Sequence, residues 1–467
     1  MLASIFGTAT RPLSTPEQVD RVASDISTFM DEQSFNTAVD VFSALRPPDQ
    51  ADVMAKLRRI DQVKLLSWLT PKKLGMIVEE LDPDDVIEIS KDLGVNHLSQ
   101  VLDEISPDVA ADVLRELPHK ARTETLSTMK EVQDVLPLID YEDDDAGGLM
   151  TPEFVSLSEN MTVSQAMDFV RRSSSTIDMN EVTFILVVDD GNILKGGLNV
   201  SRLVASDPSE LISDVMFPNV ISVSAGTDQE ECALIMEKYN LLTLPVTDSA
   251  GRLEGIVKIE DMIYVFQEEA TEDMYRMVGV SDEEKILGPF WKSVRGRLPW
   301  LCVNLATAGI AAVVITIFQS TLAQVVTLAV FLPVIAGQGG IVGTQTLTLV
   351  VRSMALGEIS NSNAKQLLAK ELGLGLVHGL ILGILAGVVA FLWHGNEYLA
   401  LVVGLAMLGN LVIAGVSGVV LPLGLRAVKV DPALASAVVV TTVTDVVGFL
   451  IYLGLATLAI GVIAGSF

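Results

Sequence analysis

The chain has 467 residues, 50% of them hydrophobic, and a formal net charge of −28 at pH 7. Five of the 59 acidic and eight of the 31 basic residues lie at or after Lys292, so residues 1–291 carry a net charge of −31 and the remainder +3. A charge this negative argues against nucleic acid and anionic lipid as partners of the first part and favours divalent cations. The two cysteines, Cys232 and Cys302, are too few for a disulfide framework or a cysteine-based zinc site.

Residues 1–131 contain a repeat of 12 residues. In most repeats a second apolar residue follows the apolar anchor by eight positions, and prolines fall just past several anchors, where proline starts a new helix. The pattern predicts one short helix per repeat, stacked as an all-α superhelical N domain. The anchors are Leu45, Leu57, Leu69, Leu81, Leu93, Ile105, Leu117 and Met129.

Residues 132–265 contain two copies of an α+β unit. The motif that starts at Met150 recurs 66 positions later from Met216. Each copy continues with an amphipathic helix (from Val163 and from Asp228), a β-rich run, a turn and a short strand. This order resembles a tandem cystathionine-β-synthase (CBS) pair, a regulatory module that often binds adenine nucleotides.

The nucleotide signature of CBS domains is only partly present in the two copies. The first copy reads Gly197 to Arg202 and the second Gly255 to Asp261, and both lack the usual arrangement of a Ser or Thr before the ribose-binding Asp. Whether ATP binds the pair is therefore left open by the sequence.

An acidic helix is predicted to lead from the CBS pair to the apolar part of the chain, with residues 266–291 as the connecting plug segment. Apolar residues keep a helical spacing from Lys258 to Met277, and Glu268 and Glu272 stand at i, i+4, where like charges repel. Composition alone also allows a connecting helix whose acidic side chains are exposed to solvent and bind no ion. Clusters of oxygen ligands suit Mg²⁺ or Ca²⁺ better than transition metals.

Residues 292–467 are predicted to be an all-α transmembrane domain of five helices. All eight basic residues fall on the side of the acidic half, which the positive-inside rule places in the cytoplasm, and an odd number of spans leaves the C-terminus outside. The N-terminus shows no basic region followed by an apolar run, so the acidic half is expected to stay cytoplasmic. The five apolar segments are Leu298 to Phe318, Leu322 to Val351, Gly373 to Trp393, Leu399 to Leu423 and Leu434 to Ile463.

Two features of these segments point to an ion path. Asp445 lies near the middle of the fifth segment, where an ionised carboxylate is costly unless it faces a bundle interior or water. A protonated or hydrogen-bonded buried carboxyl is the other interpretation. The second segment contains Gly337, Gly339, Gly340 and Gly343, which predict a broken helix that forms the wall of a pore. In the third segment, glycines at every fourth position predict a close-packing face, either structural or a subunit contact.

Three stretches together resemble the bacterial MgtE magnesium channels: Ala146 to Glu153, Gly337 to Arg352, and Asp431 to Ser436 with Thr441 to Gly448. The resemblance extends over the whole chain. It implies a homodimer in the bacterial inner (plasma) membrane, with an N domain, a CBS pair and a plug helix ahead of five transmembrane helices.

The resemblance also implies site residues. Asp445 matches the pore aspartate that holds hydrated Mg²⁺, and Asp431 a peripheral cation position. The pore-lining positions are Gly337, Gly340, Thr344, Thr348 and Thr441. The ligands of regulatory Mg²⁺ are Asp108, Asp112, the Gly148 carbonyl, Asp228, Glu230, Asp261, Glu269, Glu272 and Asp273.

The function implied is Mg²⁺ uptake through a channel that cytosolic Mg²⁺ closes. A membrane-anchored Mg²⁺ sensor without transport and a secondary transporter of broader divalent specificity are the alternatives. An enzyme is not expected, because the four histidines are scattered and the sequence has no nucleophile motif or phosphate-binding loop.

Overall fold

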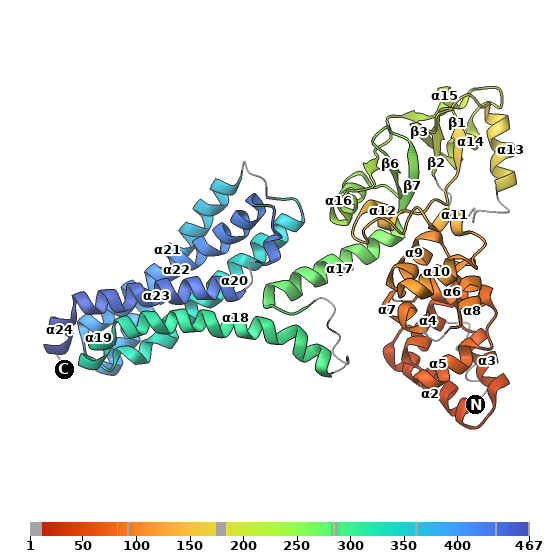
Figure 1. The fold of residues 1–467 in the computed structure, drawn as a ribbon. Coiled ribbons are helices and arrows are strands. Elements are labelled where there is room, and N and C mark those ends of the chain that lie inside the picture. The colour runs from red at the N-terminus through yellow and green to blue at the C-terminus, as the bar shows by residue number, and fades with distance from the viewer. Residues whose placement is uncertain are drawn as a thin grey trace. The chain divides into compact units, whose positions relative to one another are not determined.

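The computed structural model describes residues 12–465 except 82, 91–92, 174–183, 282–283, 285–287, 289, 360–362 and 435–436. Ala435 and Ser436, part of one motif quoted above, therefore lie outside the described residues. The chain divides into two compact units, Met1–Tyr264 and Val265–Phe467. Each unit is described by itself, and Figure 1 shows the elements of both.

The first unit begins with the helical repeat. Each repeat forms one helix, and several of these helices start with proline at the first turn, as predicted. The second apolar residue of each repeat is almost fully buried, for example Leu65 and Ile77, so the helices stack through this position. The helices are α2 (Pro16–Asp31), α3 (Phe35–Ser43), α4 (Pro47–Lys56), α5 (Arg59–Leu66), α6 (Pro71–Val78), α7 (Pro83–Ser90), α8 (Val95–Leu102), α9 (Pro107–Glu116), α10 (His119–Leu126) and α11 (Val132–Val135).

Two similar α+β halves complete the first unit. In both, a parallel pair of strands is followed by an antiparallel pair, and a β-bulge interrupts the antiparallel register at the same place. The first half contains α12 (Ala146–Leu149), β1 (Ser156–Ser158), α13 (Val163–Ser173), β2 (Phe184–Val188), β3 (Leu194–Asn199), α14 (Val200–Ala205), α15 (Ile212–Val215) and β4 (Phe217–Pro218). The second half contains β5 (Val223–Ser224), α16 (Gln229–Tyr239), β6 (Thr243–Thr247) and β7 (Leu253–Lys258).

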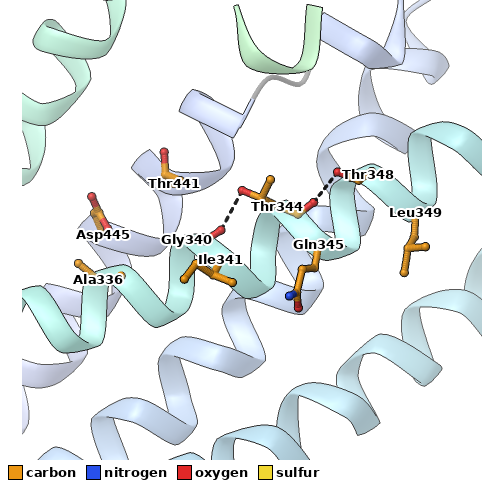
Figure 2. Close-up of a pocket in the computed structure, with 10 residues that line it drawn as sticks. Ala336, Gly340, Ile341, Thr344, Gln345, Thr348, Leu349, Thr441 and Asp445 are labelled. Carbon is orange, nitrogen blue, oxygen red and sulfur yellow. Dashed lines mark hydrogen bonds between the residues drawn. The ribbon is translucent and has the colours of Figure 1, made fainter. Parts of the chain in front are cut away.

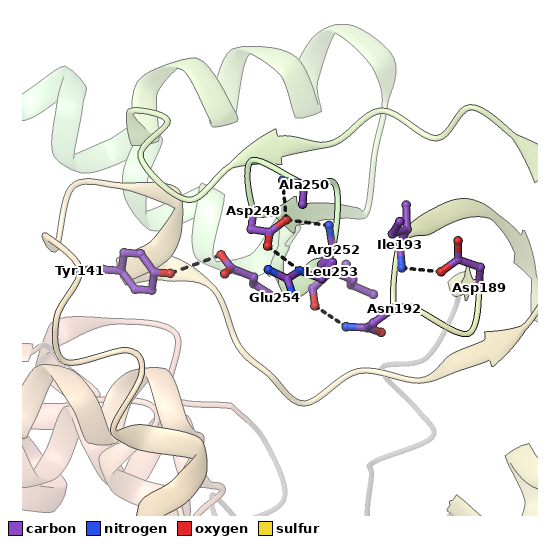
Figure 3. Close-up of polar contacts among 9 residues, drawn as sticks. All are labelled: Tyr141, Asp189, Asn192, Ile193, Asp248, Ala250, Arg252, Leu253 and Glu254. Atoms are coloured by element: carbon purple, nitrogen blue, oxygen red, sulfur yellow. Dashed lines mark hydrogen bonds and ion pairs between the residues drawn. The ribbon is translucent and has the colours of Figure 1, made fainter.

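Equivalent turns confirm the internal duplication. Asp189 Oδ1 accepts hydrogen bonds from the Gly191 and Ile193 amides at 2.8 and 3.0 Å, and Asp248 Oδ1 accepts them from the Ala250 and Arg252 amides, both at 2.8 Å. Figure 3 shows these bonds except the one from Gly191. A carboxylate that accepts from the amides of its own turn fixes that turn locally. The turns of both hairpins are therefore stabilised by the same pattern of hydrogen bonds.

The second unit contains most of α17 (Ile259–Val278) and a bundle of long helices. Among the residues that the structure describes, five helices of this unit are long and apolar enough to cross a membrane, as predicted. They are α18 (Phe290–Ile317), α20 (Leu328–Ala355), α21 (Ala364–His394), α22 (Glu397–Ala427) and α23 (Ala437–Leu458), accompanied by the short helices α19 (Gln319–Gln324) and α24 (Ile460–Gly465) and a 3₁₀ turn at Pro432–Leu434.

The predicted break in the second span is wrong, because α20 runs unbroken through all of its glycines. These glycines serve close packing. A Cβ added at Gly339 would lie 2.3 Å from Asn410 Nδ2, and one at Gly343 would lie 2.5 Å from a Val440 methyl group. An intact helix also keeps its own backbone hydrogen bonds, which an apolar environment requires.

The glycines of α21 pack against α22 of the same chain. A Cβ at Gly375, Gly379, Gly383 or Gly387 would come within 3.0 Å of α22 backbone atoms. The helices are connected by only Gly395 and Asn396. Gly395 has a φ of 68°, and Asn396 Oδ1 accepts from the Leu399 amide at 2.9 Å. The glycine face is thus structural, and the subunit-contact alternative is wrong because α22 already covers it.

Candidate functional site

One groove in the second unit brings together Asp445 and all five residues predicted to line a pore. It has a volume of about 880 Å³ and lies between α20 and α23. Figure 2 shows Thr441 and Asp445 on α23 beside the row of α20 residues. The lining residues are Ala336, Gly337, Gly340, Ile341, Thr344, Gln345, Thr348, Leu349, Thr441 and Asp445.

The threonine oxygens along this groove can accept hydrogen bonds. Thr344 Oγ1 donates to the Gly340 carbonyl at 2.9 Å, and Thr348 Oγ1 donates to the Thr344 carbonyl at 3.0 Å (Figure 2). Thr441 likewise donates within its own helix, to the Val438 carbonyl at 3.1 Å. Because each hydroxyl hydrogen is used inside the helix, the oxygen lone pairs remain to accept hydrogen bonds. Together with the Asp445 carboxylate they suit a cation that carries its own water molecules.

Helix packing behind the groove fixes this arrangement. Gly340 allows α23 to approach, since an added Cβ would lie 3.1 Å from a Thr441 methyl group. Buried Tyr452 on α23 donates to the Leu328 carbonyl at the start of α20, at 3.0 Å. Buried Asn410 on α22 donates to the Ile335 carbonyl of α20 at 2.8 Å.

A second acidic group surrounds the end of α17 within the second unit. Burial raises the pKa of Asp273 to about 6, and the nearby carboxylates of Asp431 and Glu269 add to the rise. Arg276 forms ion pairs with Glu272 on its own helix and, at 2.5 Å, with Asp431 before the 3₁₀ turn. The structure therefore brings four predicted ligands together and places an arginine between two of them.

A third acidic group lies where α9 meets the start of α17 within the first unit. Burial raises the pKa of Asp261 to about 7; Asp108 adds to the rise and Lys258 opposes it. Burial likewise raises the pKa of Asp108, and Lys258 again opposes the rise. Lys258 also forms an ion pair with Glu260 at 3.6 Å. The predicted ligands Asp108 and Asp261 are thus neighbours, with a lysine beside them.

Asp112 lies near Asp143, a residue of the segment that leads into the first CBS copy. Burial raises its pKa to about 7; ion-paired Arg115 opposes this, and Asp143 and Asp108 add to it. Arg115 also pairs with Asp143 at 2.5 Å and donates to the Leu138 and Tyr141 carbonyls at 3.0 and 3.1 Å. Arg115 therefore fastens α9 to the chain that follows α11.

Gly148, Asp228 and Glu230 come from segments that the structure pairs. The Gln229 amide donates to the Asp144 carbonyl at 2.8 Å, and the Gly147 amide donates to the Ala225 carbonyl at 2.8 Å. Asp228 caps α16 by accepting from the Glu230 amide at 2.8 Å. A Cβ at Gly148 would lie 2.2 Å from the Glu142 carbonyl oxygen, so this position requires glycine.

Within the described residues, no three His, Cys, Asp or Glu side chains are placed to hold a metal ion together. The predicted ligands occur as crowded pairs and triplets without that geometry. Sequence reasoning missed the basic residues Arg115, Lys258 and Arg276 and the buried amide of Asn410. The i, i+4 spacing of Glu272 and Arg276 could have indicated one ion pair, whereas the other contacts join positions far apart in the chain.

Comparison with known proteins adds three family matches. A model described as "Divalent cation transporter" (MgtE) matches residues 332–455. The "MgtE intracellular N domain" matches residues 23–103 and 45–144, and the CBS domain matches residues 146–205 and 212–268. The last of these confirms the tandem CBS pair.

Full-length relatives and a solved structure are also similar to the chain. "Magnesium transporter MgtE" of Thermus thermophilus is 33% identical over 94% of this chain and 98% of its own length, and that of Enterococcus faecalis is 35% identical over 91% and 94%. The structure entitled "cytosolic domain of the Mg2+ channel MgtE in complex with ATP" is 32% identical, covers 52% of this chain and 99% of its own, and has a TM-score of 0.48. Because the identity extends over nearly the whole of both relatives, the chain belongs to the MgtE family.

Proposed function

We propose that the protein is a homodimeric Mg²⁺ channel of the bacterial plasma membrane that mediates Mg²⁺ uptake and is closed by cytosolic Mg²⁺. One observation carries the proposal: a groove between two membrane-length helices contains a single carboxylate, Asp445, among glycine surfaces, threonine hydroxyl oxygens, the Gln345 amide and apolar side chains. The names of its full-length relatives support the same ion.

The groove can select a hydrated ion. Mg²⁺ gives up its water reluctantly and usually keeps several water molecules when a protein binds it. The Asp445 carboxylate and the oxygens of Thr344 and Thr441 accept hydrogen bonds from those waters, and Gly337 and Gly340 leave room for them. The ion keeps its inner shell, so it passes without the full cost of dehydration.

Charge balance supports a shared pore in a homodimer. One Asp445 neutralises half of the charge of a dication, and one carboxylate near the middle of a membrane is itself costly. Two chains facing each other across the groove would supply two carboxylates. The ion and the carboxylates would then offset each other's burial.

The acidic groups in the cytosolic part support regulation by Mg²⁺. Asp108 lies beside Asp261, and Asp273 lies beside Asp431 and Glu269. Neighbouring carboxylates repel each other, and a bound dication relieves this repulsion only in a conformation that brings the carboxylates together. Mg²⁺ would thus favour the conformation with the closest contacts, and this difference in affinity would make the clusters a switch.

The test is uptake into liposomes that contain the purified protein and a Mg²⁺ indicator. Asp445→Asn keeps the size of the side chain and removes its charge, and we expect it to abolish uptake while the protein still elutes as a dimer. Glu397→Gln, which removes an exposed acid at the start of α22, is the matched control and should transport normally.

Undiminished uptake by Asp445→Asn would overturn the pore assignment. No uptake by the wild-type protein would favour a membrane-anchored sensor. Equal uptake of Co²⁺, Ni²⁺ and Mn²⁺ in competition would favour a transporter of broader specificity.

A further inference from the structure

One fully buried amide lies between the two helices that form the groove. Asn410 is the only polar residue in the apolar stretch from Leu399 to Val416 of α22 and has an exposed fraction of 0%. Its Nδ2 donates to the Ile335 carbonyl of α20 at 2.8 Å. Polar side chains inside membrane spans mostly join helices or serve function.

The same amide meets a glycine on each neighbouring helix. A Cβ at Gly339 of α20 would lie 2.3 Å from Asn410 Nδ2, and a Cβ at Gly448 of α23 would lie 2.7 Å from Asn410 Oδ1. Neither glycine can become alanine without moving the amide. Asn410 therefore contacts α20 and α23 at the same time.

Both glycines are close to the groove. Gly339 stands between Gly337 and Gly340, which line it, and Gly448 is three residues beyond Asp445 on α23. The amide is not itself among the lining residues. A shift of the amide would thus move the two walls of the groove without touching an ion.

The amide is not optimised for stability. Asn410 Oδ1 is buried and has no hydrogen-bond partner among the residues that the structure describes. A buried carbonyl oxygen without a partner costs free energy. The Ile335 carbonyl, in contrast, lies within α20 and can accept from its own helix, so it does not depend on Asn410. A packing role alone would be better served by an apolar side chain.

We infer that Asn410 is a positioning residue that sets the spacing of α20 and α23 and thereby the size of the hydrated cation that the groove accepts. This inference rests on the proposed function. It assigns ion discrimination partly to a side chain that contacts neither the ion nor its water.

The test separates ion discrimination from folding. Asn410→Ala removes the amide, and Asn410→Leu keeps its bulk, although a methyl group cannot approach the Ile335 carbonyl to 2.8 Å. Uptake into liposomes is measured against Mg²⁺ concentration and in competition with Ca²⁺. An interhelical hydrogen bond in a membrane protein shifts an equilibrium by about threefold on average, so we expect the KM or the Mg²⁺/Ca²⁺ uptake ratio to change by about threefold or more.

Ser417→Ala is the matched control. Ser417 is also buried on α22, but its hydroxyl donates to the Ala414 carbonyl of its own helix at 3.0 Å. We expect wild-type KM and ion ratio for this variant. Gly448→Ala, which crowds Asn410 Oδ1, should alter both quantities in the wild-type background and alter them less in the Asn410→Ala background.

Wild-type KM and ion ratio in folded Asn410→Ala and Asn410→Leu would overturn the inference. If Asn410→Ala does not fold, Asn410→Leu and Gly448→Ala decide by the same two quantities. Wild-type uptake that does not depend on Asp445 would instead overturn the proposed function, a result that the Asp445→Asn measurement reports separately.

Discussion

Each crowded acidic group contains a basic side chain of the chain itself. A fixed positive charge neutralises part of the repulsion between carboxylates and leaves less for a dication to neutralise. The Mg²⁺ dependence of each group is therefore expected to reflect its basic residue as well as its acids. The three combinations are Lys258 with Asp108 and Asp261, Arg115 with Asp112 and Asp143, and Arg276 with Glu272 and Asp431.

Asp261→Asn should raise the melting temperature of the chelator-treated protein, and by more at pH 8 than at pH 5. Burial and Asp108 raise the pKa of Asp261 from 3.8 to about 7. The native state thus holds the proton more tightly than the unfolded chain. Stability contributed by this carboxyl falls as the pH rises from about 4 to 7, and the loss is complete above that range. Asparagine cannot ionise, so the variant does not lose this stability as the pH rises.

Glu260→Gln is the control for this measurement, since Glu260 is the exposed neighbour of Asp261. Its effect on the melting temperature should be small at both pH values. Equal pH profiles for the two variants would mean that the environment of Asp261 does not raise its pKa.

The residues of the groove were expected from the resemblance to the MgtE channels, and their regular spacing agrees with that expectation. Gly337, Gly340, Thr344 and Thr348 follow one another at intervals of three or four and so share one face of a helix. Asp445 stands out as a lone charge in an apolar segment. Asn410 could not be predicted in the same way, because its importance comes from contacts with α20 and α23.

At the scale of elements, the repeat was the most informative signal. A period of 12 residues with proline at the start of several repeats is sufficient to predict one helix per repeat, and α4 to α10 confirm it. The second apolar position of these repeats is buried, and Val53, Leu65 and Ile77 each have an exposed fraction of 0%. Local periodicity works here because each helix packs on helices close to it in the chain, for example α4 on α6 and α6 on α8.

The form of α20 could not be predicted from its composition. Gly-rich segments lower helix propensity, and this favoured a break. Tertiary packing reversed the preference, since Gly339, Gly340 and Gly343 allow Asn410, Thr441 and Val440 to approach the backbone closely. Those neighbouring residues lie on α22 and α23, far from α20 in the sequence, so the composition of α20 does not reveal them.

The end of α17 offers a prediction about regulation. Arg276→Gln should require about two- to fivefold more Mg²⁺ for half-maximal closure, because ion pairs of partly exposed residues contribute up to about 1 kcal/mol. Without the guanidinium, Asp431 repels Glu272 and Asp273. The measurement is channel current in membrane patches as Mg²⁺ is varied on the cytosolic face.

Arg276→Lys keeps the charge and should stay close to the wild-type midpoint. If Arg276→Gln closes at the wild-type Mg²⁺ concentration, the pairs with Glu272 and Asp431 do not contribute to closure. Met277 packs beside the buried cluster of Leu347, Val351, Ala433 and Val440, so α17 is expected to remain folded in both variants.

At the scale of the whole molecule, composition marks where the membrane-length helices begin, whereas the two compact units divide earlier, between Tyr264 and Val265. The boundary inferred from charge, at Lys292, falls near the start of α18 at Phe290, the first helix long and apolar enough to cross a membrane. The fold class was predictable because repeats, duplicated motifs and long apolar segments each specify an architecture by themselves. The basic residues within the acidic groups required the folded structure.

The distribution of basic residues gives a prediction for topology. The C-terminus should lie outside the cytoplasm, because Lys and Arg occur only at one end of the spans and the described part of the chain has five of them, an odd number. A cysteine in place of Ser466, with both native cysteines changed to serine, should react with an impermeant maleimide in intact spheroplasts. A cysteine in place of Ser14 should react only after lysis. Labelling of both positions only after lysis would contradict this topology.

The α21–α22 interface has a consequence for how the bundle assembles. Contact positions recur every four residues on both helices, with Gly375, Gly379, Gly383 and Gly387 opposite Val412, Leu408, Gly404 and Ala400. Sliding one helix past the other by four residues, about 6 Å, would bring three of the four glycines opposite the next partner, so the interface alone accepts more than one alignment. The two-residue connection of Gly395 and Asn396 is too short for the shifted ones. An insertion in this connection would therefore allow α21 and α22 to pack in a shifted alignment, because the contact surfaces of the two helices do not prevent it.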